Sequence, residues 1–180
     1  MKCCAVVDTN VLVAALLSKR DDSATVRVIR TMLSGEFTRL YHEDILNEYE
    51  DVLHRKKKYD LSERAIQTVL NAIRRFGIEV FPKPTGEIFI DEDDIIYYEV
   101  AMEKLEDNAN PVTGNMKHYP MRDYIITPAE MVTILEKKKA SERKEIESSC
   151  WVWVRRSKRF MKRPFGSDRM VVFSYIRIMK

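Results

Sequence analysis

Acidic and amide side chains that could bind a metal occur in four short groups along the 180-residue chain. Residues 8–10 (DTN) follow an apolar run, Glu48 lies in a helical pattern, residues 91–94 (DEDD) precede another helical pattern, and residues 113–115 (TGN) resemble a turn. Carboxylates that are brought together repel each other, and burial increases this penalty. A hard divalent cation such as Mg²⁺ or Mn²⁺ relieves the repulsion and prefers oxygen ligands. If these groups meet, they can support activation of water and stabilisation of charge on a phosphate.

Each group also has an interpretation without catalysis. Asp8 can cap the helix that follows it, and Glu48 can be a solvated charge on an amphipathic helix. Residues 91–94 favour a helix N-terminus through the macrodipole, and residues 113–115 suit a turn. The histidines show no metal-ligand spacing and are expected to be structural or surface residues; they are His42, His54 and His118. The sequence alone leaves open whether the acids converge.

The elements that must position these groups alternate between strands and helices. Apolar runs predict strands over residues 3–8, 37–41, 78–81 and 124–127. Helical spacing predicts helices from 11, 23–34, from 43, 61–76, 94–105 and from 128. The last helix has a capping box made by Thr127 and Glu130, with Pro128 between them. Such alternation predicts an α/β fold with a mostly parallel central sheet and helices on both faces. Ligands of such sheets bind at the carboxyl ends of strands, where Asp8 is expected.

Charge is distributed unevenly along the chain. Residues 137–180 contain 14 Lys or Arg and 4 Asp or Glu, whereas residues 1–136 contain 17 and 24. This break predicts a domain over residues 1–137 and a basic C-terminal extension of unknown role over residues 138–180.

Two interpretations of the basic extension remain open. It can bind RNA or an acidic partner through its Lys and Arg residues, or it can be an added stabilising or dimer-contact element. Residues 137–146 are expected to extend the last helix of the body, whereas residues 151–154 and 171–178 have strand character.

Composition excludes several classes of protein. The longest apolar run, residues 11–17, is far shorter than the about 20 residues that a membrane span needs. Asp8 interrupts the apolar start, which makes a poor signal peptide. Three Cys provide neither a disulfide framework nor a zinc spacing. We therefore expect a soluble cytoplasmic protein with no membrane partner.

Five segments resemble, in order, the motifs of PIN-domain nucleases. They are residues 6–13 (VVDTNVLV), 45–53 (ILNEYEDVL), 91–101 (DEDDIIYYEVA), 113–120 (TGNMKHYP) and 125–130 (IITPAE). The last two resemble a PIN branch whose members are described as toxin components of toxin–antitoxin systems. The resemblance covers about residues 1–137. It implies a three-layer α/β/α fold and a metal-dependent endoribonuclease that hydrolyses RNA phosphodiester bonds.

The resemblance also implies roles for individual residues. Asp8, Glu48 and Asp94 correspond to the catalytic acids that ligate Mg²⁺ or Mn²⁺. Four further residues have supporting roles: Asn10 orients Asp8, Asp93 is the nearest competitor of Asp94, Thr113 belongs to the closing loop, and Asn115 takes the fourth acidic position.

The chain departs from the family pattern at two positions. Asn115 stands where many PIN domains carry an acid, so the site is expected to bind metal weakly. Pro111 lacks an N–H where an interior strand is expected, which places the local geometry and the strength of catalysis in question.

The resemblance implies an RNA substrate, a possible antitoxin protein and a possible homodimer. Residues 55–58 (RKKK) are the main cationic cluster of the body, although a solvated helix end explains them equally well. A non-catalytic PIN scaffold that binds RNA or protein is the first alternative function. An aspartate-based phosphatase using Asp8 is less favoured, because position 10 is Asn and not a second acid.

Overall fold

The computed structural model describes residues 3–55 and 61–160, and the chain divides into two compact units, Met1–Lys137 and Lys138–Lys180. The first unit contains a parallel sheet in the order β3-β2-β1-β4. Its strands are β1 (Cys4–Val7), β2 (Thr38–Tyr41), β3 (Ile78–Glu79) and β4 (Ala109–Val112). Consecutive parallel strands require crossover connections, and helices provide them.

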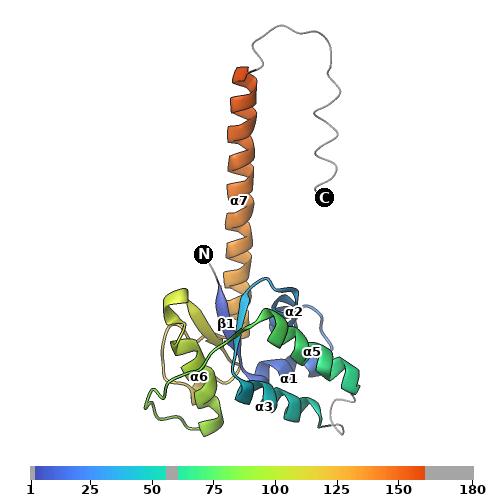
Figure 1. Ribbon diagram of the computed structural model, residues 1–180, viewed down its shortest axis with the longest axis vertical. Coiled ribbons are helices and arrows are strands. Elements are labelled where there is room, and N and C mark those ends of the chain that lie inside the picture. Colours follow the sequence, from blue (N-terminus) through green and yellow to red (C-terminus); the bar gives the residue numbers. More distant parts are fainter. Residues whose placement is uncertain (1–2, 56–60, 161–180) are drawn as a thin grey trace. The chain divides into compact units, whose positions relative to one another are not determined.

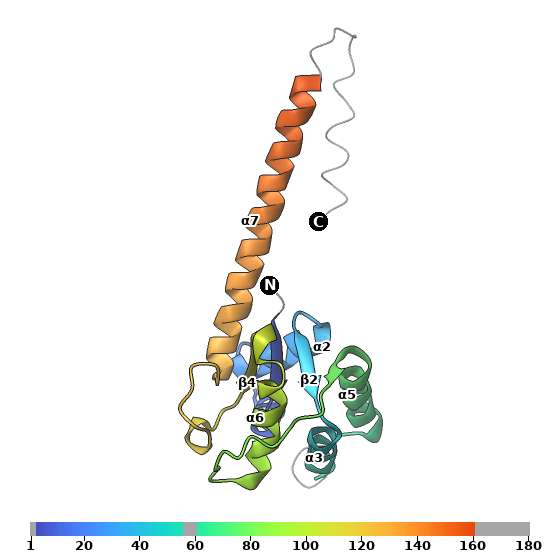
Figure 2. The same ribbon diagram turned by 60° about the vertical axis from the view of Figure 1, so that its left-hand side comes forward.

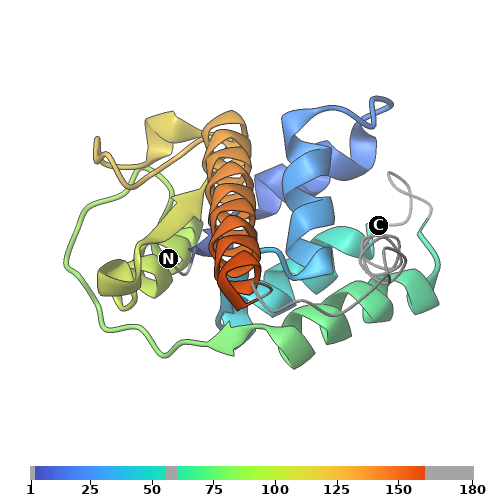
Figure 3. The ribbon, with the colours of Figure 1, turned by 90° about the horizontal axis from the view of Figure 1, so that it is seen from above.

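The helices cover both faces of this sheet. They are α1 (Thr9–Leu17), α2 (Ala24–Ser34), α3 (Glu43–Leu53), α5 (Glu63–Phe76), α6 (Ile95–Met102) and α7 (Pro128–Phe160). Short 3₁₀ helices are η1 (Glu92–Asp94), η2 (Leu105–Asp107) and η3 (Met116–His118). Helix α6 packs on β1, β2 and β4 and lies on one side of the sheet, whereas α1, α2 and α5 lie on the other (Figures 1 and 3). The expected three-layer α/β/α fold with a parallel central sheet is therefore confirmed.

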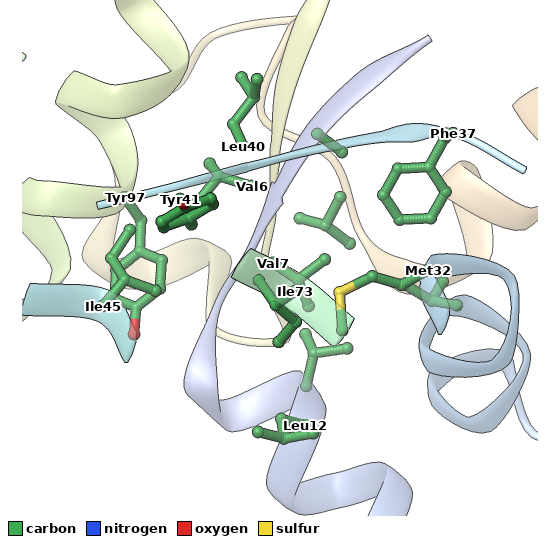
Figure 4. Close-up of a cluster of buried hydrophobic side chains, with 14 of the residues drawn as sticks. Val6, Val7, Leu12, Met32, Phe37, Leu40, Tyr41, Ile45, Ile73 and Tyr97 are labelled. Carbon is green, nitrogen blue, oxygen red and sulfur yellow. The ribbon is translucent and has the colours of Figure 1, made fainter. Parts of the chain in front are cut away.

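The core forms around β1, which lies between β2 and β4 in the sheet and is buried at every position. Val6 and Val7 are almost completely inaccessible to solvent, and Leu12 and Met32 pack with them from α1 and α2 (Figure 4). Tyr97 of α6 belongs to the same cluster. A strand buried on both faces needs a continuous apolar sequence, which explains the run that ends just before Asp8.

Local capping interactions are present at the ends of α2 and at the start of α7. The Ser23 side chain accepts a hydrogen bond from the Val26 N–H at the start of α2, and Gly35 ends that helix with a φ of 77°. At the start of α7, the Thr127 N–H donates to Glu130 Oε2 at 2.7 Å, while the Glu130 N–H donates to Thr127 Oγ1 at 3.3 Å. This reciprocal pair is the expected capping box.

The prediction of a strand over residues 124–127 is wrong. Only an isolated parallel bridge joins Ile126 to Val112, because Thr127 already caps α7 and leaves no room for a longer ladder. Pro111 lies in β4, where its C=O accepts a hydrogen bond from the Ile126 N–H at 3.0 Å. In an extended strand the N and C=O of one residue face the same side, so the Pro111 nitrogen faces the outer edge and costs no bond to β1.

Helix α7 extends farther than expected. It includes residues 137–146, as predicted, but it also includes residues 151–154, where a strand was expected. A short apolar run such as WVWV does not distinguish a strand from a helix by itself, and here it continues a helix that is already formed. Residues 171–178 lie outside the described part of the chain. No helix among the described residues is long and apolar enough to span a membrane.

Candidate active site

Asp8 stands at the carboxyl end of β1 and is 4% exposed. Figure 2 shows the neighbouring strands β4 and β2, with α6 in front of the sheet. Its backbone N–H donates to the Val112 carbonyl at 3.0 Å, which fixes the end of β1 against β4. Its Oδ1 accepts a hydrogen bond from the Asn10 N–H at 2.9 Å, so Asp8 is the N-cap of α1. Because capping uses one oxygen only, it does not exclude a second role for the carboxylate.

The other oxygen of Asp8 is surrounded by neutral donors. Oδ2 accepts from Asn10 Nδ2 at 2.7 Å, from Thr113 Oγ1 at 2.7 Å and from the Tyr119 hydroxyl at 3.3 Å. Asn10 is held in turn, because its Oδ1 accepts from the Gly114 N–H at 2.9 Å. This network fixes the orientation of a buried carboxylate, and among the described residues its hydrogen-bond donors are all neutral.

Glu48 enters the same region from α3. The hydroxyl of Tyr97, which comes from α6, donates to Glu48 Oε2 at 2.7 Å and lies 2.6 Å from Thr9 Oγ1. The adjacent Tyr49 hydroxyl donates to the backbone carbonyl of Val7. These bonds connect α1, α3 and α6 at the end of β1.

Asp94 is the third acid, at the junction of η1 and α6. Its side chain is 13% exposed, and its Oδ2 lies 2.9 Å from His118 Nδ1. The Oδ2 atom of Asp91 lies farther from the same nitrogen, at 3.9 Å. Asp93 differs from Asp94, because its side chain is exposed and none of the described hydrogen bonds ties its carboxylate.

These acids line one groove of about 490 Å³. Its acidic side comprises Asp8, Glu48, Asp91, Asp93 and Asp94, with Asn10, Asn115 and His118 beside them. The remaining lining is mainly apolar and ends at Arg55. The carboxyl edge of the sheet thus bears an acid-lined groove, where ligands of parallel α/β sheets bind.

Burial raises the pKa of each of the three acids above its ordinary value. For Asp8, hydrogen bonds from Asn10 and Thr113 oppose this increase, and the charge of Asp94 adds to it. Burial also raises the pKa of Glu48, against the hydrogen bond from Tyr97. Burial raises the pKa of Asp94, against the hydrogen bond to His118. The protein therefore holds these carboxylates in an environment that disfavours their charge.

The donor set suits a divalent cation. Carboxylates from the end of β1, from α3 and from η1 line one groove, and oxygen donors are the ligands that hard divalent cations prefer. Asp91, Asp94 and His118 also bring donor atoms within 4.8 Å of one another. Asp8 and Glu48 line the same groove as this cluster, and a His nitrogen beside carboxylates is compatible with Mn²⁺ as well as Mg²⁺.

The structure brings the predicted site residues together. Six of them line the groove, namely Asp8, Asn10, Glu48, Asp93, Asp94 and Asn115. Thr113 is buried and donates to Asp8, so it supports the site from below the surface.

Three residues near the acids escaped the sequence analysis. Tyr97 and Tyr119 lie within two of the motif segments but were given no role there, although their hydroxyls contact Glu48 and Asp8. The expectation for His118 was incomplete, because it lines the groove and contacts Asp94. His42 and His54 do have local roles, in capping α3 and in contacting Glu63. No spacing along the chain marks His118 as different from these two.

A parallel α/β sheet with an acid-lined groove at the carboxyl end of a central strand is the arrangement of α/β proteins whose groove suits a divalent metal. Residues 4–115 match the family model described as PIN domain, and the chain belongs to the PIN-domain family. The chain is also similar to the crystal structure of VapBC2 from Rickettsia felis bound to a DNA fragment from their promoter, at 17% identity and a TM-score of 0.43. That alignment covers 68% of this chain and 96% of the other. None of the curated proteins matches this chain.

Proposed function

We propose that this protein is a Mg²⁺- or Mn²⁺-dependent endoribonuclease that hydrolyses RNA phosphodiester bonds. The observation that carries the proposal is the convergence of Asp8, Glu48 and Asp94 from three elements on one groove of a PIN domain. The resemblance of residues 113–120 and 125–130 to a toxin branch further suggests a toxin component with an antitoxin partner, acting in the cytoplasm.

Asp8, Glu48 and Asp94 would hold the cation directly or through water. A bound Mg²⁺ or Mn²⁺ lowers the pKa of a coordinated water and offsets charge on the phosphate. The chain's own contribution is to fix the acids: Asn10 and Thr113 orient Asp8, and His118 orients Asp94. Such fixed orientation reduces the reorganisation needed when charge develops on the phosphate.

The geometry also bears on the phosphatase alternative. A nucleophilic Asp8 would attack through a carboxylate oxygen, but Oδ2 already accepts three hydrogen bonds and Oδ1 accepts one. Attack would therefore require breaking part of the network that holds α1 and the 113–119 loop. This arrangement favours Asp8 as a fixed ligand and not as a nucleophile.

The test is an RNA cleavage assay with Mg²⁺, with Mn²⁺ and with EDTA. Cleavage that needs metal and stops in EDTA supports the nuclease. A protein that binds RNA without cutting it under any of these conditions is instead the non-catalytic scaffold. A covalent aspartyl phosphate formed from a phosphate-ester substrate indicates the phosphatase class.

A further inference from the structure

The groove has a second part that the proposed chemistry does not use. Away from the acids it is lined by four apolar side chains and a guanidinium: Val13, Ala14 and Leu17 of α1, Val52 of α3, and Arg55. Leu17 is 49% exposed, and Arg55 is also exposed. An apolar wall and a cation are thus accessible from solvent and continuous with the acids.

Helical geometry explains how α1 and α3 form this extension. Asn10 and Leu17 are seven residues apart, about two turns, so they lie on one face of α1. Glu48 and Arg55 have the same separation, and the Arg55 N–H donates to the Val52 carbonyl at 3.2 Å, so the chain still follows a helical turn there. Because α1 and α3 pack against each other, both faces border the same groove.

The seven-residue spacing sets how far the apolar part of the groove extends from the acids. At 1.5 Å of rise per residue, seven residues correspond to about 10 Å along a helix. Leu17 therefore lies about this far from Asn10 along α1, and Arg55, two residues beyond the end of α3, lies past Glu48 in the direction in which that helix ends. A phosphate contacted by Arg55 is then a neighbour of the phosphate held at the acids, and the apolar wall faces the sugar and base between them.

The charges of the groove indicate which occupant fits. Its described lining contains five carboxylates, and Arg55 is the one Lys or Arg among them. A polyanion is repelled by the carboxylates, so its attraction to the groove depends strongly on Arg55. A nucleotide combines an anionic phosphate with a sugar and base that pack on apolar surface, and it matches a wall of this composition.

We propose that Val13, Ala14, Leu17 and Arg55 form a subsite for the nucleotide next to the cleaved phosphate of single-stranded RNA. Arg55 contacts the phosphate of that nucleotide, and α1 contacts its sugar and base. This subsite rests on the proposed function, because it takes the cleaved RNA as its occupant. It favours single strands, since bases in a duplex are stacked and paired and are not available to the wall.

Matched substitutions on the full-length protein test the subsite. Arg55→Ala is compared with Arg64→Ala, which removes an exposed guanidinium from α5 that does not line the groove. Leu17→Asp is compared with Leu16→Asp, its neighbour, which is 39% exposed and does not line the groove. The probe is a short fluorescent single-stranded RNA, with its binding followed in EDTA by anisotropy and its cleavage followed in Mn²⁺.

We expect Arg55→Ala to weaken RNA binding about tenfold, the size of a lost charged hydrogen bond, and to raise KM while kcat stays unchanged. The salt slope of binding should fall by about 0.7, and Arg55→Lys should restore it. Leu17→Asp should weaken binding, while Leu16→Asp and Arg64→Ala change it less than twofold. Equal effects within each matched pair would overturn the subsite. Absence of metal-dependent cleavage by the unsubstituted protein would overturn the proposed nuclease instead, because the binding comparison does not depend on cleavage.

Discussion

Individual residues at the groove show how the chain holds acids that repel each other. Asp8 is stabilised by neutral donors from Asn10, Thr113 and Tyr119, whereas Asp94 has a contact with His118. Burial raises the pKa of Asp8, and the hydrogen bonds from these neutral donors, which favour the charged form, oppose that increase only in part. The carboxylate of Asp8 is therefore oriented in advance, in surroundings that disfavour its charge, which is compatible with the proposed cation site.

Asp94→Asn should separate the effect of this negative charge on stability from its effect on cleavage. The amide oxygen still accepts from His118, while the repulsion with Asp91 and Glu48 disappears. We therefore expect a higher free energy of unfolding at pH 7.5 without metal, and a loss of cleavage of about a hundredfold or more. Urea unfolding and the RNA cleavage assay measure the two effects. Asp93→Asn is the control, and a larger loss of cleavage in this variant than in Asp94→Asn would assign the metal role to Asp93.

His118 should act by positioning Asp94. In His118→Asn the side-chain amide occupies roughly the place of Nδ1 and can donate to Asp94, whereas in His118→Gln it corresponds to the more distant Nε2. Residues that hold a metal ligand typically contribute 10- to 100-fold to metal affinity. We expect His118→Gln to weaken Mn²⁺ binding by about this factor and His118→Asn to weaken it much less, as measured by calorimetry. Equal losses in both variants would contradict a role for the Nδ1 contact.

At the scale of elements, the ends of helices and strands place the acids. β1 is central and buried, so its carboxyl end brings Asp8 to the edge where α1 begins. α3 and α6 meet there through Glu48 and Tyr97. The turn from α5 into β3 is equally constrained, because Gly77 lies against the backbone of α5 and the side chains of β2.

Two glycines that end helices should respond differently to substitution by alanine. A Cβ at Gly77 would lie 2.6 Å from the Ile73 carbonyl oxygen and 2.8 Å from Tyr41 Cδ1. We therefore expect Gly77→Ala to cost about 3 kcal/mol through overpacking. Gly35 has a φ of 77°, and a Cβ there would come no closer than 4.0 Å to Arg39 Nη2, so Gly35→Ala should cost about 1 kcal/mol through backbone strain alone. Urea unfolding of both variants compares the two costs, and a larger cost at Gly35 would contradict the packing argument.

At the scale of the whole molecule, the charges differ sharply between the two ends of the chain. The body carries an excess of acids and residues 137–180 an excess of bases. The assignment of residues 1–137 as a nuclease domain and 138–180 as a basic extension stays a prediction. Within the body, the groove acids dominate the expected response to pH and metal.

Stability without metal should fall as pH rises above the ordinary carboxylate range. Asp8, Glu48 and Asp94 have raised pKa values in the folded protein, so the folded state retains protons that the unfolded chain has already lost. The contribution of these acids to the free energy of unfolding is fully present below their unfolded pKa values of 3.8 for Asp and 4.5 for Glu. It is lost as pH rises through their higher pKa values in the folded protein.

Mg²⁺ or Mn²⁺ should restore the stability that is lost as pH rises, since a ligand that binds only the folded state stabilises it. At a hundredfold excess over Kd the gain is about 2.7 kcal/mol. Melting temperatures at pH 5 and 7.5, with and without Mn²⁺, measure the effect. We expect the larger increase at pH 7.5, where the carboxylates are charged. A larger increase at pH 5 would show that the metal binds elsewhere.

The sequence by itself determined the features that depend on neighbours along the chain. The buried β1, the capping box at Thr127 and the alternation that specifies a parallel α/β sheet all follow from local spacing, whereas the capping role of Asp8 was one of two open interpretations. The order of acidic motifs also determined the family. Local patterns failed where one pattern fits two structures, as in residues 124–127 and 151–154.

Only the tertiary structure decided which side chains meet across the groove. Tyr97 and Glu48 are 49 residues apart, and His118 and Asp94 are 24 residues apart. No periodicity connects such pairs, because their distance depends on how α3, α6 and the 113–119 loop pack against β1. The same packing placed Arg55 in the groove, where its sequence context alone equally suited a solvated helix end. Contacts within a helix follow from its repeat, whereas contacts between elements exist only once the core has fixed their positions.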